Sequence, residues 1–263
     1  MKDELVKLDI DGRGVATLTL NRPEVHNAFN DAVITRLSEI FAALKDDGNV
    51  RVVVVRASGK SFSAGADAKW MRSAAGYSKD RNMADAMRMG EMLRLFNFLP
   101  KPTIALVQGA ALGGGVGLVS CCDIVIASRN AKFGLTEVRL GLTPATISPY
   151  VVAAIGSRHA RRYFVTGERF DAETACEIGL VHEVADDHNA LDEAGERIIG
   201  ACLAGAPGAI ADAKRLQFTV AGRPVDDELM VDTARYIAEG RASAEGKEGL
   251  AAFLEKRRPG WAS

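Results

Sequence analysis

The chain has 263 residues, of which 48% are hydrophobic and 25% charged, as in a globular protein with a sizeable core. Its formal net charge of −1 provides no positive field, which argues against nucleic acid or an acidic membrane surface as a partner. No apolar stretch approaches the ~20 residues that span a bilayer, and no signal peptide is recognised, so we expect a cytoplasmic protein. The four cysteines form no CxxC pair and predict reduced thiols in the core, with no metal site.

The first half of the chain alternates strand signals with helix signals. The expected strands are 15–20, 51–55, 103–107 and 122–127. The expected helices are 31–44, with Asn30 or Asp31 as its cap, and 83–98. Because strands and helices alternate, we expect a parallel sheet with crossover helices.

After about residue 157 the strand signal nearly vanishes, with Val181 to Val184 as the main exception. The segments with helical spacing are 157–166, 171–179, 189–204, 207–219, 225–240 and 243–256. We therefore divide the chain into an α/β core of residues 1–200 and a helical region of residues 201–263. Short amphipathic helices form a poor core alone, so this region should pack on the core or on another subunit.

A glycine-rich segment, residues 109–117, directly follows the apolar run 103–107. Consecutive glycines leave backbone N–H groups unshielded, and a helix beginning there would offer them to a negative group. Such a site suits a phosphate, a carboxylate or the oxyanion of a reacting carbonyl. The phosphate motifs fail on spacing: Gly115-Val116 stands where a P-loop needs its lysine, and Leu118 stands where a dinucleotide fingerprint needs its third glycine. Glycines packed against a neighbouring helix are the structural alternative.

Further motifs surround this segment in a fixed order. They are residues 20–23 (LNRP), 27–29 (NAF), 62–67 (FSAGAD), 111–115 (ALGGG), 122–123 (CD), 133–137 (FGLTE), 179–181 (GLV) and 253–257 (FLEKR). In their order and spacing the chain resembles the crotonase (enoyl-CoA hydratase/isomerase) superfamily over nearly its whole length. The resemblance implies an α/β core of repeated ββα units in a spiral, with a C-terminal all-helical oligomerisation region. It also implies a homotrimer or a dimer of trimers.

The resemblance implies an acyl-CoA thioester as substrate and an enolate oxyanion held by two backbone N–H groups. By motif position these belong to Ala66 and Gly114, and Glu137 matches the family's second catalytic glutamate, which moves a proton at the substrate carbon. Coenzyme A enters as part of the substrate, so no separate cofactor is expected. The further residues expected around the substrate and its CoA moiety are Val25, Asn27, Ala28, Ala64, Asp67, Ala68, Lys69, Gly113, Gly117, Phe253 and Lys256.

One position departs from the pattern of two-glutamate hydratases. Their first catalytic glutamate would fall at Gly117, so Glu137 is left as the only carboxylate of the family pattern. We expect this change to open space beside the thioester for a branched or polar acyl group.

The segment 141–150 and the chain's ending look like those of bacterial hydratases for 3-methylglutaconyl-CoA, in leucine breakdown, or γ-carboxygeranoyl-CoA. The candidates for holding the distal carboxylate of such a substrate are Thr146, Ser148 and Arg139. The expected activity is therefore hydration of a 2-enoyl-CoA, with a branched acyl group. A single-glutamate Δ3,Δ2-enoyl-CoA isomerase and a non-catalytic CoA-binding scaffold are the alternatives.

Overall fold

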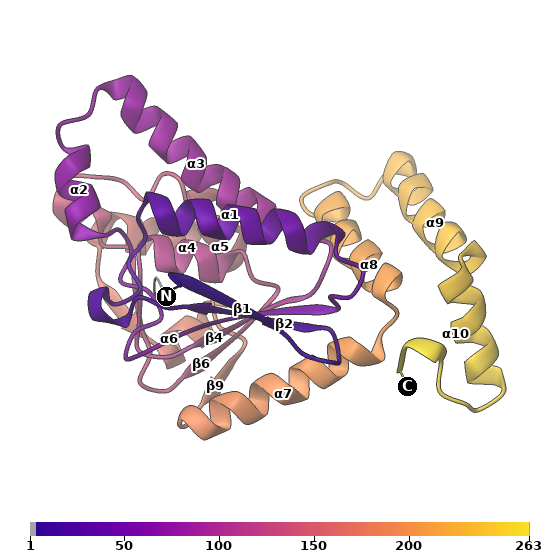
Figure 1. Cartoon of the computed structure of the whole chain (residues 1–263). Coiled ribbons are helices and arrows are strands. Elements are labelled where there is room, and N and C mark those ends of the chain that lie inside the picture. Colours follow the sequence, from indigo (N-terminus) through magenta and orange to yellow (C-terminus); the bar gives the residue numbers. More distant parts are fainter. Residues whose placement is uncertain (1–3, 263) are drawn as a thin grey trace.

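The computed structural model describes residues 4–262, which form two β-sheets with helices on both faces of the larger one (Figure 1). The larger sheet has the strand order β1-β2-β3-β4-β6-β9, and the smaller has the order β5-β7-β8. The strands are β1 (Val6–Ile10), β2 (Val15–Leu20), β3 (Val52–Ala57), β4 (Thr103–Val107), β5 (Ala110–Leu112), β6 (Ile124–Ser128), β7 (Lys132–Gly134), β8 (Arg169–Asp171) and β9 (Glu183–Ala185). The helices are α1 (Asp31–Asp46), α2 (Ala68–Ala74), α3 (Lys79–Asn97), α4 (Gly114–Ser120), α5 (Ser148–Thr166), α6 (Ala172–Glu177), α7 (His188–Ala204), α8 (Pro207–Val220), α9 (Asp227–Ala242) and α10 (Ala244–Leu254). Three short 3-10 turns complete the chain: η1 (Pro23–Val25), η2 (Glu137–Leu140) and η3 (Gly260–Ala262).

The larger sheet confirms the expected parallel arrangement, since β2, β3, β4, β6 and β9 pair in parallel and only β1 runs antiparallel at the edge. Its central strand β3 is buried on both faces, as its β-branched run predicts. Val53 and Val55 face a core shared with α1, α3, α4 and α5, whereas Val52 and Val54 face a second core beneath α7. Because successive side chains of a strand point to opposite faces of the sheet, β3 contributes residues to both cores.

Some helix boundaries agree with the predicted ones, and others differ for identifiable reasons. Helix α1 is capped by Asn30, one of the two predicted caps, whose side chain accepts a hydrogen bond from the Val33 N–H at 3.0 Å. The helix expected from residue 157 begins at Ser148, because Gly156 with φ 72° breaks it into two parts and the sequence pattern revealed only the second. The short elements α2, β5, β7 and β8 were not expected from the sequence, since too few residues carry their periodicity.

Strand β5 corrects the expectation that the run 103–107 leads straight into the glycines. Gly109, with φ 61°, turns the chain after β4, and β5 then pairs with β7 in the smaller sheet. A bridge between Ser63 and Ala111 brings the loop after β3 beside β5. The glycine-rich helix α4 therefore begins where two sheets and two loops meet.

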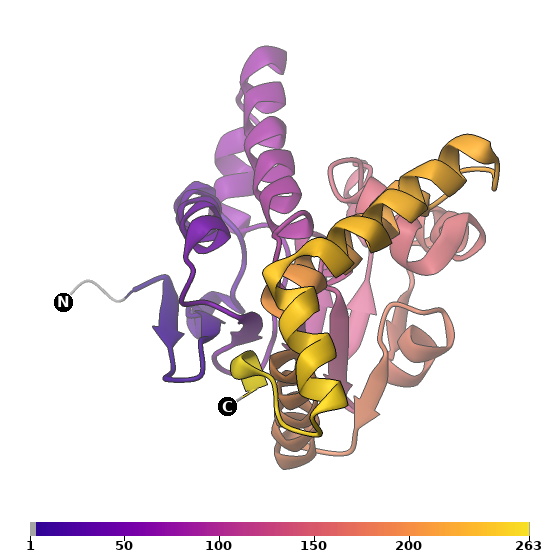
Figure 2. The same cartoon turned by 90° about the vertical axis from the view of Figure 1, so that its right-hand side faces the viewer.

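Helices α9 and α10 extend away from the sheets (Figures 1 and 2), whereas α8 contacts the core, where the ring centroids of Phe218 and Phe98 lie 4.8 Å apart. The chain then returns to the core, where the indole N–H of Trp261 donates to the Ala204 carbonyl at 3.1 Å and Arg51 donates to the Trp261 carbonyl at 3.2 Å. Helix α7, which ends at Ala204, packs on the sheet. The division of the chain near residue 200 stays a prediction. Over residues 4–262 no helix has both the length and the apolar character needed to cross a membrane.

Candidate functional site

Gly114, at the start of α4, lines a small cavity, and Gly113 precedes it beside Glu137. Gly113 has φ 49°, which favours glycine, and a Cβ there would lie 3.0 Å from Oε1 of Glu137. A Cβ on Gly114 would lie 3.0 Å from the Phe29 ring. The absence of side chains at these two positions therefore leaves the backbone of α4 open to Glu137 and to the cavity.

Two backbone N–H groups meet at this point. Phe29 donates to the Gly65 carbonyl at 2.7 Å and accepts from the Asp67 N–H at 2.8 Å, which pairs Phe29 with Ala66 in a parallel bridge. In such a bridge the N–H of Ala66 points away from Phe29 and stays available. A Cβ on Gly65 would lie 3.7 Å from the Gly114 nitrogen, so the two loops touch. Within residues 4–262 neither the Ala66 N–H nor the Gly114 N–H donates a hydrogen bond.

Glu137 is the ionisable group at this site. It begins the turn η2, three residues after the end of β7, and its side chain is mostly buried beside Gly113. Its Oε2 atom is buried and has no hydrogen-bond partner among the described residues. Burial raises the pKa of Glu137 above its ordinary value, because the charged form loses its hydration there.

The cavity has a volume of about 150 Å³ and an apolar lining. It is lined by Phe29, Ile34, Ala66, Trp70, Met89, Gly114, Glu137, Thr143, Pro144, Ala145, Thr146 and Ile147. Among these residues Glu137 alone carries an ionisable group. The cavity thus brings together the three residues predicted to be catalytic: Glu137, Ala66 and Gly114.

The expectation that Gly117 opens space beside the thioester is wrong. Gly117 is buried, and a Cβ there would lie 2.3 Å from Cγ2 and 2.8 Å from Cβ of Ile147. Ile147, at the start of α5, thus occupies the volume that a side chain at position 117 would take. Gly117 is needed for this packing and is absent from the cavity lining.

The three candidates for holding a distal carboxylate differ in position. Thr146 lines the cavity. The Ser148 hydroxyl donates to the Ala145 carbonyl at 2.7 Å, so it stabilises the start of α5 instead. Arg139 is exposed and packs near Gly167, outside the lining. No arginine, lysine or histidine contributes to the described lining.

Asn27 and Asp67, predicted to approach the substrate, use their side chains to hold the loops together. The Asn27 amide donates to the carbonyls of Ser58 and Ser61, each at 2.8 Å, and its oxygen accepts from the Arg22 N–H at 2.7 Å. Asp67 pairs with the Arg22 guanidinium at 2.8 Å and caps α2 through the Lys69 N–H. Although burial opposes it, this guanidinium helps to hold the pKa of Asp67 below its ordinary value. Arg22 is therefore central to the site, and its place in the LNRP motif could have indicated this.

The other predicted CoA-binding residues fall into two groups. Val25, Ala28, Ala64, Ala68 and Lys69 belong to the same loops and to the start of α2; Lys69 and Ala68 are exposed. Phe253 and Lys256 lie at the end of α10, on the opposite side of the molecule from α2 (Figure 1), and Phe253 is 79% exposed. The single chain does not bring these two residues to the cavity.

The sequence analysis missed part of the apolar lining. Met89 in α3 and Ile34 in α1 follow the helical spacing of core residues, so nothing in the pattern distinguishes them from packing residues. Trp70 in α2 also lines the cavity, and its buried indole N–H has no acceptor among the described residues.

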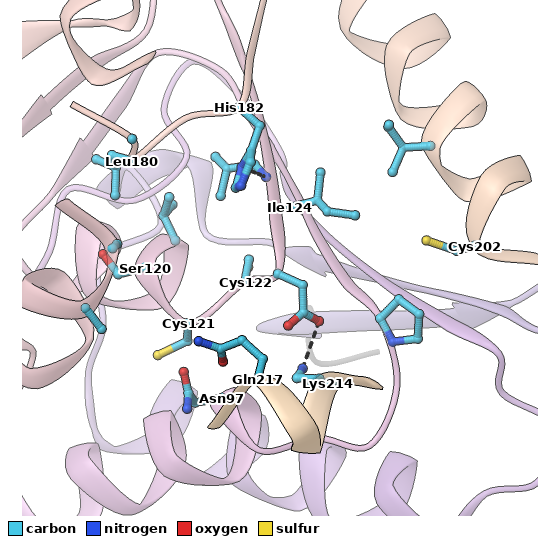
Figure 3. Close-up of a pocket in the computed structure, with 18 of the residues that line it drawn as sticks. Asn97, Ser120, Cys121, Cys122, Ile124, Leu180, His182, Cys202, Lys214 and Gln217 are labelled. Carbon is cyan, nitrogen blue, oxygen red and sulfur yellow. Dashed lines mark hydrogen bonds and ion pairs between the residues drawn. The ribbon is translucent and has the colours of Figure 1, made fainter. Parts of the chain in front are cut away.

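A second cavity of about 770 Å³ lies at the other end of α4, between the start of β6 and a face of α8 that includes Lys214 and Gln217 (Figure 3). Lys214 pairs there with Asp123 at 2.8 Å, and burial raises the pKa of the Cys121 and Cys122 thiols. In the described part of the chain no cluster of histidine, cysteine and acidic side chains could hold a metal ion.

Known proteins resemble this chain over almost its full length. The family model described as enoyl-CoA hydratase/isomerase matches residues 11–263. The crystal structure of an enoyl-CoA hydratase from Shewanella pealeana is 42% identical, with a TM-score of 0.95 over 99% of this chain and 97% of that chain. The structure of AtuE from Pseudomonas aeruginosa is 38% identical, with a TM-score of 0.94 over 99% of this chain and 100% of that chain. A crotonyl-CoA hydratase from Syntrophomonas wolfei is 33% identical over 95% of each chain.

Proposed function

Because this chain belongs to the enoyl-CoA hydratase/isomerase family, with its crotonase fold and its action on enoyl-CoA thioesters, we propose that Glu137, Ala66 and Gly114 carry the hydration of a 2-enoyl-CoA. One observation carries the proposal. Among the described residues, two backbone N–H groups without an acceptor and a buried carboxyl oxygen without a partner, Oε2 of Glu137, line the same small apolar cavity. Free N–H donors beside such a carboxyl are what a reacting thioester carbonyl and its proton transfer require.

In the proposed reaction the thioester carbonyl oxygen accepts hydrogen bonds from the Ala66 and Gly114 N–H groups. The Glu137 carboxylate takes a proton from water while the water oxygen bonds to the β-carbon, and the electron pair of the double bond moves into the enolate. The protonated Glu137 then returns its proton to the α-carbon. A raised pKa brings the two forms of Glu137 closer in free energy near neutral pH, which suits a group that serves first as base and then as acid.

The lining supports a small, uncharged acyl group better than a carboxylated one. A distal carboxylate would find the Thr146 hydroxyl, but no cation among the described lining residues, and burying an unpaired charge is costly. The distal carboxylate of 3-methylglutaconyl-CoA therefore needs a counter-charge from outside this lining. Hydration of this substrate, with a role in branched-chain amino acid breakdown, is the alternative that the assay below addresses.

We also propose a homotrimer or a dimer of trimers built through the C-terminal helices. Several apolar side chains on α9 and α10 are more than half exposed, and such a face requires a partner. They are Met230, Val231, Ile237, Leu250, Phe253 and Leu254. Phe253 and Lys256 would then approach the CoA moiety bound to a neighbouring subunit.

The proposal is tested by following the absorbance of the conjugated enoyl thioester with crotonyl-CoA and with 3-methylglutaconyl-CoA. We expect hydration of crotonyl-CoA at the higher kcat/KM, and loss of turnover in Glu137→Gln. Conversion of a 3-enoyl-CoA without hydration would favour the isomerase, for which one carboxylate suffices. A non-catalytic scaffold would be favoured if the wild type binds CoA thioesters without turning them over and Glu137→Gln does not change that behaviour.

A further inference from the structure

We propose that Ile147 determines which acyl groups this enzyme accepts, by filling the place that a second carboxylate or a substituent at the β-carbon would otherwise occupy. The inference rests on the proposed hydration at Glu137 and Gly114. It concerns a side chain that the proposed chemistry does not use.

The contact between Ile147 and Gly117 is the first observation. Cγ2 of Ile147 lies 2.3 Å from where a Cβ on Gly117 would be, so no side chain fits at position 117 while Ile147 keeps its place. The next neighbour of that position, Cδ1 of Leu93, is 3.8 Å away and leaves ordinary contact space. The obstruction therefore comes from Ile147 alone.

The position of this contact on α4 is the second observation. Gly117 follows Gly114 by three residues, which is about 4.5 Å along a helix axis, on nearly the same face. An acyl group whose carbonyl oxygen accepts from the Gly114 N–H would share the small cavity with Ile147. Ile147 itself lines the cavity that holds Glu137 and Gly114.

Ile147 is also held firmly in place, so that its side chain forms a rigid part of the cavity lining. It is 4% exposed, and its carbonyl accepts from the N–H groups of Tyr150 and Val151 at 3.2 and 3.1 Å. Pro144 before it is buried, and the Ser148 hydroxyl after it closes the turn on the Ala145 carbonyl at 2.7 Å. A β-branched side chain on such a fixed backbone has few rotamers with which to yield to a bulky substrate.

The experiment compares crotonyl-CoA with 3-methylcrotonyl-CoA, which adds one uncharged methyl at the β-carbon. Initial hydration rates are measured for the wild type, Ile147→Val, Ile147→Ala and the control Ile155→Ala. Ile155 lies in the same helix, is also 4% exposed and does not line the cavity. We expect Ile147→Ala to raise the ratio of kcat/KM for the methylated over the linear substrate by about tenfold or more, the usual worth of one methyl group in an apolar site. Ile147→Val, which keeps Cγ2, should raise it less, and Ile155→Ala should leave it unchanged.

A second pair of variants tests the contact itself. Gly117→Ala should lower the melting temperature and the rate with crotonyl-CoA, and Ile147→Ala in the same chain should restore both in large part. Tolerance of Gly117→Ala in the wild type, or an unchanged substrate ratio in an active Ile147→Ala enzyme, would overturn the inference. A wild type that hydrates neither thioester would instead contradict the proposed function.

Discussion

The two ends of helix α4 face cavities of opposite character. At its first residue, Gly114, lies a cavity of about 150 Å³ in which one carboxyl oxygen of Glu137, Oε2, and two backbone N–H groups have no partners within the described chain. Beyond its last residue lies a cavity of about 770 Å³, where Asp123 is bound to Thr103 through both its N–H and its hydroxyl and to Lys214, each at 2.8 Å. The larger space is thus the one whose charged groups are already satisfied.

In the proposed function, groups without partners mark the reactive site, and cavity volume does not. A carboxylate oxygen that already accepts three hydrogen bonds, as in Asp123, has little left to offer a ligand. A carboxyl oxygen without a partner in an apolar cavity remains available to a substrate, and burial has raised the pKa of Glu137 above its ordinary value. Substitutions at the two ends of α4 test this contrast.

The largest effect is expected from Glu137→Gln. Glutamine keeps the shape of the side chain and cannot transfer the proton, so kcat with crotonyl-CoA should fall by about 10²–10⁴-fold. The rate is measured from the loss of enoyl absorbance, and the melting temperature should not fall. A variant with wild-type kcat would remove Glu137 from the chemistry.

The next effect concerns the N–H of Gly114. Gly114→Pro removes this donor at the first position of a helix, where proline is tolerated, and should lower kcat by about 10²–10³-fold. Gly114→Ala is the matched control: it keeps the N–H and adds a Cβ at the same 3.0 Å from the Phe29 ring. If the two variants lose the same activity, the loss is steric and the donor is unimportant.

At the other end of α4 we expect a change in stability and none in chemistry. Lys214→Met removes the cation from Asp123 in a pair that is 10% and 30% exposed, which should lower the free energy of unfolding by about 1–3 kcal/mol. Arg94→Met, which breaks an exposed pair with Glu91, should lower the free energy of unfolding much less than Lys214→Met does. Denaturant midpoints measure both. A large fall in kcat for Lys214→Met, with the fold intact, would make the second cavity part of the reaction.

The smallest effect is the contribution of Glu137 to the pH dependence of stability. Its pKa in the folded protein lies above its ordinary value of 4.5, so between these two values the folded state holds a proton that the unfolded state has lost. The contribution is therefore fully present below pH 4.5 and is lost as the pH rises through the folded pKa. Relative to Glu137→Gln, the wild type should become less stable over this range. A difference between the two proteins that is independent of pH would show that the pKa is not raised.

Much of this fold was predictable from local pattern. The β-branched run of β3, the capping Asn30 of α1 and the helical spacing of the second half each depend on residues close in sequence. Gly156 concealed the first half of α5, and β5 was too short to show a period. Both failures occur where local periodicity carries too little information.

The amino-acid sequence alone was enough to place the glycine-rich segment 109–117, the segment 62–67 and Glu137 in one family pattern, because motif order and spacing are linear properties. What stands opposite Gly117 depends on the tertiary structure. The missing side chain suggested open space, yet Ile147, thirty residues later in the chain, packs there with its Cγ2 2.3 Å from the position of the absent Cβ. Whether a glycine leaves a gap depends on which distant residue fills it, since protein interiors are close-packed and a neighbour's position is set by the fold.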